Sequence, residues 1–234
     1  MVDLKEFEQK AADLRVLGMK ISIGQDTVYE KYWDEDCRRN IYSASKSFTS
    51  CAVGFAVQEG LIDLDERLMD AFKEDIPNNP DENLKKATVK DLLTMTLGQE
   101  KGFLMGKQRP RMEEQNWVKA SLAIPFVYEP GTHFVYNNVG PYLAGILVQR
   151  RAGCDLLSYL TPRLLKPLGI RKTIWEVDPE GNTFGAGGLF LTVSELHKLG
   201  MFYLQNGCWN GKKLLSKEWI HESTRKQVEN NKNS

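Results

Sequence analysis

Two residues near position 45 have the types and spacing that can activate a hydroxyl group. The segment IYSASKSFTSCAVGFAVQEG, residues 41–60, contains Ser43 and Lys46, three positions apart. A serine hydroxyl is a poor nucleophile at neutral pH and needs a base within hydrogen-bonding distance. If a helix begins near residue 43, one turn brings the lysine amine to the serine hydroxyl. The spacing fits a nucleophile with its own base, and it also fits a polar helix start.

The helix itself would assist such a reaction. A lysine acts as a base only where its pKa is lowered, and partial burial beside the positive end of a helix lowers it. The same helix end directs backbone N–H groups toward the acyl oxygen that becomes negative during attack. Residues 51–57 are apolar on every side, which predicts a helix buried in the middle of a domain.

Spacing alone is weak evidence, because the pattern Ser-x-x-Lys occurs twice in this chain. The second pair, Ser223 and Lys226, lies in a polar segment near the C-terminus. About one match is expected by chance at this composition. Ser43 differs in its context, since two alternating segments precede it and an apolar helix follows it.

The surrounding elements predict an α+β fold. Residues 3–14 have helical spacing of apolar side chains, and the alternating segments 19–24 and 27–33 predict a β-hairpin. Further helices are predicted downstream, one of them capped by Thr88. Segment 73–86 is rich in Pro, Asn and charge, which predicts a surface loop. The irregular segment 98–117 fits equally a lid over a site or a surface excursion.

Composition bounds the function. The chain has 234 residues, 41% of them hydrophobic, and 31 basic residues balance 31 acidic ones. A net charge of zero gives no field that favours nucleic acid or anionic lipid, so we expect neither as a partner. The acidic N-terminus and the lack of a run of roughly 20 apolar residues predict a soluble, cytoplasmic protein.

Cysteine usage predicts neither disulfides nor zinc. No two cysteines have CxxC spacing, and no histidine lies nearby at metal-ligand spacing, which suits reduced thiols. The four are Cys37, Cys51, Cys154 and Cys208. We expect no metal and no organic cofactor.

The order of motifs resembles one known family. YSASKSFTSCAVGFAVQEGLIDLDERL, VKDLLTMT, EPGTHFVYNNVGPYLAGILVQRRAG and GAGGLFLTVSELHKLG follow one another at spacings similar to those of the serine β-lactamase-related and penicillin-binding family. The likeness is greatest to the class C β-lactamase and esterase branch and covers nearly the whole chain. It implies a β-lactamase/transpeptidase-like α+β fold, in which helices and a helical region flank an antiparallel sheet.

The resemblance also implies roles for four residues. Ser43 becomes the acylated nucleophile and Lys46 its proton acceptor. The second family motif, YxN, falls on Tyr136 and Asn138: the tyrosine shares the role of base, and the asparagine contacts the substrate amide and the lysine. Without the resemblance, Tyr136 could be a half-buried aromatic residue in a turn and Asn138 a helix cap.

The third family motif, a Lys- or His-containing triad ending in glycine, has no counterpart here. The resemblance therefore implies a single domain over 1–234 that lacks the C-terminal strands. Its parts are 1–60 (helix, hairpin and nucleophile helix), 61–175 (mostly helical), 176–225 (return to the sheet side) and 226–234 (disordered tail). Because this strand supplies an oxyanion donor, we expect weak activity or none, and self-association through the exposed sheet edge.

The leading functional hypothesis is a serine hydrolase that forms a covalent acyl-enzyme with a small-molecule acyl substrate: a β-lactam, a D-alanyl peptide or a small ester. The alternative is a non-catalytic binding module of the same fold, inactive because the third motif is missing. A Ser-His-Asp hydrolase is disfavoured, because GxSxG is absent and His133, His197 and His221 fit surface or capping positions.

Overall fold

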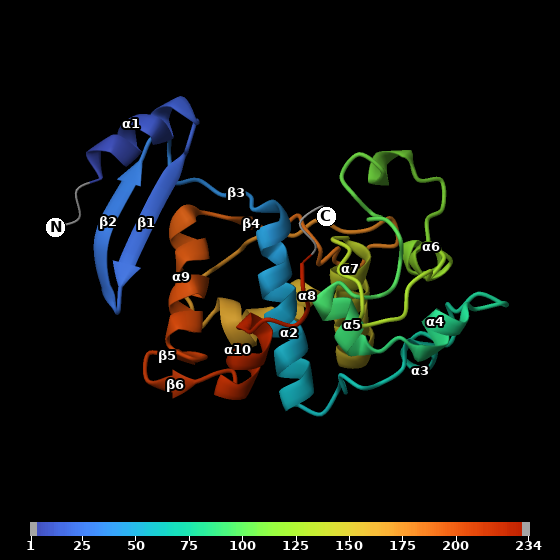
Figure 1. Ribbon diagram of the computed structural model, residues 1–234. Coiled ribbons are helices and arrows are strands. Elements are labelled where there is room, and N and C mark those ends of the chain that lie inside the picture. Colours follow the sequence, from blue (N-terminus) through green and yellow to red (C-terminus); the bar gives the residue numbers. More distant parts are fainter. Residues whose placement is uncertain (1–3, 231–234) are drawn as a thin grey trace.

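The N-terminal part of the molecule is a helix laid against a β-hairpin. The structure is a computed structural model that describes residues 4–230. Helix α1 spans Lys5–Asp13, and the antiparallel strands β1 (Gly18–Ile23) and β2 (Asp26–Tyr32) follow it. The helix and the hairpin predicted from sequence are confirmed. Figure 1 shows this unit at one end of the molecule, with the N-terminal side of the chain on its outer edge.

The helix that follows Ser43, predicted to carry the nucleophile, crosses the centre of the molecule. A 3₁₀ turn, η1 (Tyr42–Ala44), leads into α2 (Ser45–Gln58), most of whose residues are buried. Helical structure thus begins close to the predicted start near residue 43: Ser43 lies in the 3₁₀ turn, and Lys46 lies in the first turn of the α-helix. This tighter turn still leaves the two side chains on the same side of the chain.

The central core is built on α2, α5 (Val89–Thr94) and α7 (Val139–Ala152). Helix α7 is buried almost from end to end and packs against both of the others. Close packing requires a small residue at its start: a Cβ on Gly140 would lie 2.2 Å from the carbonyl oxygen of Leu92 on α5. A larger residue there would separate the two helices.

Short helices and irregular segments cover this core at the end far from the hairpin. They are α3 (Leu68–Ala71), α4 (Glu82–Lys86), η2 (Arg109–Arg111) and α6 (Trp117–Leu122). Helix α4 corrects the sequence prediction of a loop over 73–86. The charged run of residues 82–86 places its two lysines in the last turn, where they suit the negative end of the helix. The predicted cap of α5 is confirmed, since Thr88 and Asp91 form a capping box.

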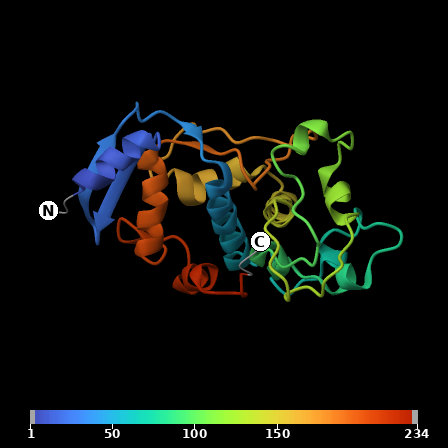
Figure 2. The same cartoon turned by 45° about the horizontal axis from the view of Figure 1, so that its top comes forward.

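The chain then returns toward the hairpin. The elements of this return are α8 (Leu156–Leu160), the π-helical turn η3 (Thr161–Leu165), β4 (Phe190–Leu191), α9 (Val193–Leu204), β5 (Cys208–Trp209), β6 (Lys212–Lys213) and α10 (Lys217–Thr224). Strand β4 pairs with β3 (Arg39–Asn40), which directly precedes the nucleophile turn. Helix α9 packs against β1 and joins the hairpin to the rest of the molecule (Figure 2).

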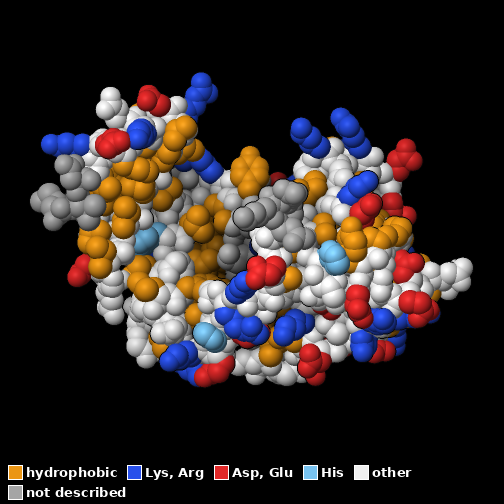
Figure 3. Space-filling model, in the orientation of Figure 1, with side chains coloured by type: hydrophobic (Ala, Val, Ile, Leu, Met, Phe, Trp, Pro, Cys, Tyr) orange, Lys and Arg blue, Asp and Glu red, His pale blue; other side chains and the backbone are white. Residues whose placement is uncertain are grey.

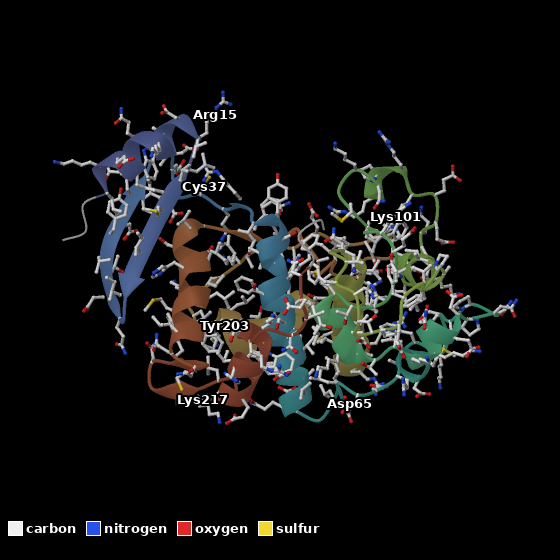
Figure 4. All side chains as sticks on the ribbon, viewed as in Figure 1. Arg15, Cys37, Asp65, Lys101, Tyr203 and Lys217 are labelled. Atoms are coloured by element: carbon white, nitrogen blue, oxygen red, sulfur yellow. The ribbon has the colours of Figure 1, made fainter. Side chains whose placement is uncertain are left out.

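Helices and antiparallel strand pairs together confirm the predicted α+β class. The space-filling view shows a hollow between the hairpin and the helices, with apolar side chains on its walls (Figure 3). Helix α9 contacts α2 through Tyr203, which is labelled in Figure 4. The Tyr203 hydroxyl lies 3.5 Å from Cys51 Sγ.

The predicted disordered tail, 226–234, falls partly outside the described residues, which end at Asn230; within 226–230 the chain forms neither helix nor strand. Of the helices in residues 4–230, none has the length and apolar character that crossing a membrane requires.

Candidate active site

The structure brings the hydroxyl of Ser43 into contact with two of the predicted groups. Its Oγ lies 2.7 Å from the Tyr136 hydroxyl and 3.0 Å from Lys46 Nζ. Tyr136 comes from the irregular segment before α7, 93 positions along the chain. The phenol O–H donates to Ser43 Oγ, and the serine keeps its own proton for a second partner.

The contacts of Lys46 leave one position of its amine free for that proton. Nζ donates to Asn138 Oδ1 at 2.7 Å and to the Ala186 carbonyl oxygen at 2.6 Å. Both partners are acceptors only, so they use two N–H bonds. In the neutral amine the remaining lone pair then faces Ser43 Oγ. This is the arrangement that a general base for the serine hydroxyl needs.

The pKa of Lys46 favours the neutral amine. Burial lowers this pKa from the ordinary lysine value to about 8, and the positive charge of Arg109 adds to the effect. A lysine with an ordinary pKa would be almost wholly protonated at neutral pH and unable to accept a proton. With a pKa of about 8, a useful fraction of the amine is neutral.

Asn138 is held in the orientation that the lysine requires. Its Nδ2 donates to the Leu104 carbonyl oxygen at 2.9 Å, which turns Oδ1 toward Lys46. Its backbone N–H donates to the Phe103 carbonyl oxygen at 3.2 Å. Segment 98–117 is therefore packed directly on the YxN turn and is not a detached surface excursion. Asn138 also stands at the N-cap position of α7, but its side chain makes no capping bond.

Two buried hydroxyls of α2 fix the nucleophile turn against the segment after Phe184. Ser45 Oγ donates to the Tyr42 carbonyl oxygen at 2.6 Å and accepts from the Leu189 N–H at 3.1 Å. Thr49 Oγ1 donates to the Gly185 carbonyl oxygen at 2.7 Å. The same segment carries the Ala186 carbonyl that binds Lys46, so these bonds fix the positions of Ser43 and Lys46 relative to each other.

A cavity of about 120 Å³ lies beside Lys46, between α2, α5 and α10. Most of its exposed lining is apolar, and it includes Leu64, Leu93, Met95 and Trp219. Lys46 thus lines a space that suits a small apolar group.

The second Ser-x-x-Lys pair is not assembled. Ser223 Oγ donates to the Ile220 carbonyl oxygen, and Lys226 forms an ion pair with Glu229. The contacts of His133 do not include the four predicted site residues: its ring stacks on Tyr128, and its Nδ1 lies 2.8 Å from Thr132 Oγ1. Within residues 4–230, no three His, Cys, Asp or Glu residues form a group that could hold a metal ion.

Sequence reasoning missed three contributors to this site: Arg109, Glu176 and the carbonyl of Ala186. A carbonyl oxygen leaves no signal in residue identity. Arg109 and Glu176 look like ordinary surface charges in the sequence, and only the fold brings them together, at 3.2 Å.

Comparison with known proteins identifies the family of this chain. A family model described as Beta-lactamase matches residues 5–234. The chain belongs to the Beta-lactamase family. The resemblance noted from the motif order is thereby confirmed.

Curated relatives in this family include acyl-transferring and ester-cleaving enzymes. Monacolin J acid methylbutanoyltransferase of Aspergillus terreus is 31% identical over 157 residues, which cover 58% of this chain and 37% of that protein. Lovastatin esterase of Penicillium rubens is 31% identical over 150 residues, with coverage of 55% and 37%. The match thus spans little more than a third of the length of either relative.

Solved structures show the same fold. An octameric penicillin-binding protein homologue from Pyrococcus abyssi superposes with a TM-score of 0.79 at 22% identity, over 99% of this chain and 62% of that one. Simvastatin synthase from Aspergillus terreus gives a TM-score of 0.64 at 22% identity, over 90% and 67%. The β-lactamase/transpeptidase-like fold predicted from sequence is confirmed.

Proposed function

We propose that this chain is a serine acyl hydrolase that forms a covalent acyl-enzyme on Ser43. The observation that supports this most directly is the position of Ser43 Oγ between the Tyr136 hydroxyl and the lone-pair side of Lys46. A serine with a donor on one side and a depressed-pKa amine on the other is arranged for proton loss during attack.

The proposed reaction has two steps. Ser43 Oγ attacks the carbonyl carbon of the substrate, and its proton passes to the base shared by Lys46 and Tyr136. The C–O bond to the leaving alcohol breaks, and the alcohol takes that proton. Water then attacks the acyl-enzyme, gives a proton to the same base, and releases the acid; the proton returns to Ser43 Oγ. The Tyr42 and Ala44 N–H groups of the η1 turn donate to Asn40 Oδ1 and to the Ile41 carbonyl oxygen, so the Ser43 N–H is the proposed oxyanion donor of this turn.

The pH dependence follows from the Lys46 pKa of about 8. Below that pH the amine is protonated and cannot accept the serine proton. We therefore expect the rate of Ser43 acylation to rise between about pH 7 and pH 9.

We propose a small ester with a short apolar acyl group as the substrate class. Two observations support this choice over a β-lactam or a D-alanyl peptide. The cavity beside Lys46 is lined mainly by apolar groups, and the curated relatives are named as an esterase and a methylbutanoyltransferase.

Covalent labelling tests the proposal. The chain is incubated with a fluorophosphonate probe, a fluorescent penicillin and p-nitrophenyl butyrate, and adducts are read by intact mass. We expect a one-to-one adduct in the wild type and none in Ser43→Ala. Ser223→Ala, which removes the serine of the second Ser-x-x-Lys pair, is the matched control and should label fully.

Three other outcomes of the labelling experiment would change the proposal. Labelling by the penicillin without ester turnover would favour a β-lactam substrate. Equal labelling of Ser43→Ala would reject Ser43 as the nucleophile. A folded wild type that no reagent labels would favour the non-catalytic binding module.

A further inference from the structure

Segment 98–117 forms one wall of the acylation centre. Leu104 and Phe103 offer their carbonyl oxygens to Asn138, as described above. The segment approaches so closely that a Cβ on Gly102 would lie 2.7 Å from the carbonyl oxygen of Tyr136. A displacement of this wall would therefore disturb the two YxN residues that contact Ser43 and Lys46.

Arg109 anchors the wall to the opposite side of the site. Its Nη1 donates to Glu176 Oε2 at 3.2 Å, and its guanidinium carbon lies 4.3 Å from the ring centre of Phe184. The side chain is largely buried, and its Nε has no hydrogen-bond partner in the described part of the chain. Phe184 stands two residues before Ala186, whose carbonyl binds Lys46.

Glu176 connects Arg109 to the turn that contains Ser43 through hydrogen bonds. Its second oxygen, Oε1, accepts from Asn40 Nδ2 at 3.3 Å, and Asn40 Oδ1 accepts from the Tyr42 N–H at 2.7 Å. Glu176 also lies directly on Gly188: a Cβ there would be 2.4 Å from the Glu176 Cβ, and φ is +82°. Gly188 thus allows the carboxylate to stand between the wall and the turn that carries Ser43.

We propose that Arg109 is a positioning residue of the acylation centre, which, paired with Glu176, fixes the 98–117 wall and places a permanent positive charge beside Lys46. This rests on the proposed function for its catalytic meaning. Arg109 touches neither Ser43 nor Lys46 in any described hydrogen bond, so it acts through its field and through the residues it holds.

The charges around Lys46 single out Arg109. Ser43, Tyr136 and Asn138 face the amine as neutral groups. Lys90 from α5 and Glu222 from α10 line the adjoining cavity; Glu222 pairs with Arg225 at 2.5 Å and lies 3.9 Å from Lys90. The positive charge that lowers the Lys46 pKa is that of Arg109, reduced in part by Glu176, and it helps to keep the amine neutral.

The direct test is the titration of Lys46 by NMR in protein labelled with ¹³C-lysine, with Lys46→Arg used only to assign the signal. Arg109→Gln removes the neighbouring charge, so we expect the Lys46 pKa to rise by roughly half a unit to one unit. Arg109→Lys keeps the charge and should restore a titration near that of the wild type. Arg111→Gln is the matched control, since Arg111 is exposed on the same 3₁₀ turn, and it should change nothing.

The pH profile of Ser43 acylation is the functional readout. In Arg109→Gln the acidic limb should move to higher pH by the same amount, so that labelling at pH 7 slows threefold to tenfold. If Arg109→Gln does not fold, Glu176→Gln replaces it; removal of the counter-charge should then lower the Lys46 pKa.

The two proposals can fail separately. An unchanged Lys46 titration in Arg109→Gln, or a shift that Arg109→Lys does not restore, overturns the role of Arg109 even if Ser43 is acylated. A wild type that no reagent acylates, but whose Lys46 pKa rises in Arg109→Gln, rejects the proposed function and supports the coupling.

Discussion

At the scale of single residues, each polar atom of Lys46 and Asn138 is held by specific hydrogen-bond partners. Lys46 Nζ has three partners, and two of them are oxygens that can only accept. Asn138 has its amide orientation set by the Leu104 carbonyl. These hydrogen bonds hold the Lys46 amine in one orientation without a carboxylate partner. A carboxylate would have raised the pKa of Lys46.

Ser45 gives the sharpest test at this scale. Ser45→Ala leaves the buried Leu189 N–H without its acceptor, and an unpaired buried donor costs about 1–3 kcal/mol. We expect that loss in the free energy of unfolding, measured by urea denaturation. Ser47→Ala, on the exposed side of the same helix, should change it by less than about 0.5 kcal/mol. Equal losses in the two variants would contradict the assigned role of Ser45.

The four site residues were within reach of sequence reasoning because they stand in two short patterns whose order along the chain resembles a known family. Ser43 and Lys46 are one turn apart, and Tyr136 and Asn138 share one tight turn. Arg109 was out of reach, because its partners Glu176 and Phe184 lie 67 and more positions away, and nothing local to Arg109 distinguishes it from Arg111.

At the scale of elements, the start of α5 was predictable, because Thr88 is followed three positions later by an acidic residue that completes a capping box. Thr192 begins α9 with the same motif. Helix α4 was missed because Pro and Asn upstream of it outweighed five residues of weak helical signal. The 3₁₀ form of the turn that carries Ser43 was not predicted, because one of the two Ser45 hydrogen bonds that fix it reaches the distant Leu189 N–H.

Gly54 tests how α10 is seated on α2. A Cβ at Gly54 would lie 2.5 Å from Nε1 of Trp219, a residue only 8% exposed. Gly54→Ala should push α10 outward and lower the free energy of unfolding by about 1–3 kcal/mol. The control, Gly200→Ala on α9, meets nothing within 4 Å and should stabilise by about 0.5–1 kcal/mol. Differential scanning calorimetry of both variants gives the two signs, and a stabilised Gly54→Ala would contradict this packing.

At the scale of the whole molecule, two bodies of structure meet across the nucleophile helix. The hairpin and α9 lie on one side, and the helical region with its irregular wall lies on the other (Figures 1 and 2). In the described residues, β1 pairs only with β2, so the edge of β1 that faces away from β2 has no strand partner. Ile23 at the end of β1 is 64% exposed.

The self-association inferred from the open edge stays a prediction. An unpaired strand edge with exposed apolar side chains favours pairing between copies, and a lysine on the edge opposes it. We expect sedimentation velocity to show a mass that rises with concentration for the wild type. The double variant Leu17→Lys, Ile23→Lys should remain monomeric over the same range. A monomeric wild type at every concentration would refute the idea.

The separation of the site residues along the chain has a consequence for folding. Contacts of Ser43 and Lys46 reach 93 and 140 positions along the sequence. Helices form within microseconds from local contacts, whereas closing long loops is slower. We therefore expect a refolding chain to regain its helical circular dichroism before Ser43 can be labelled. The delay before labelling would measure how long the contacts of Ser43 and Lys46 take to form.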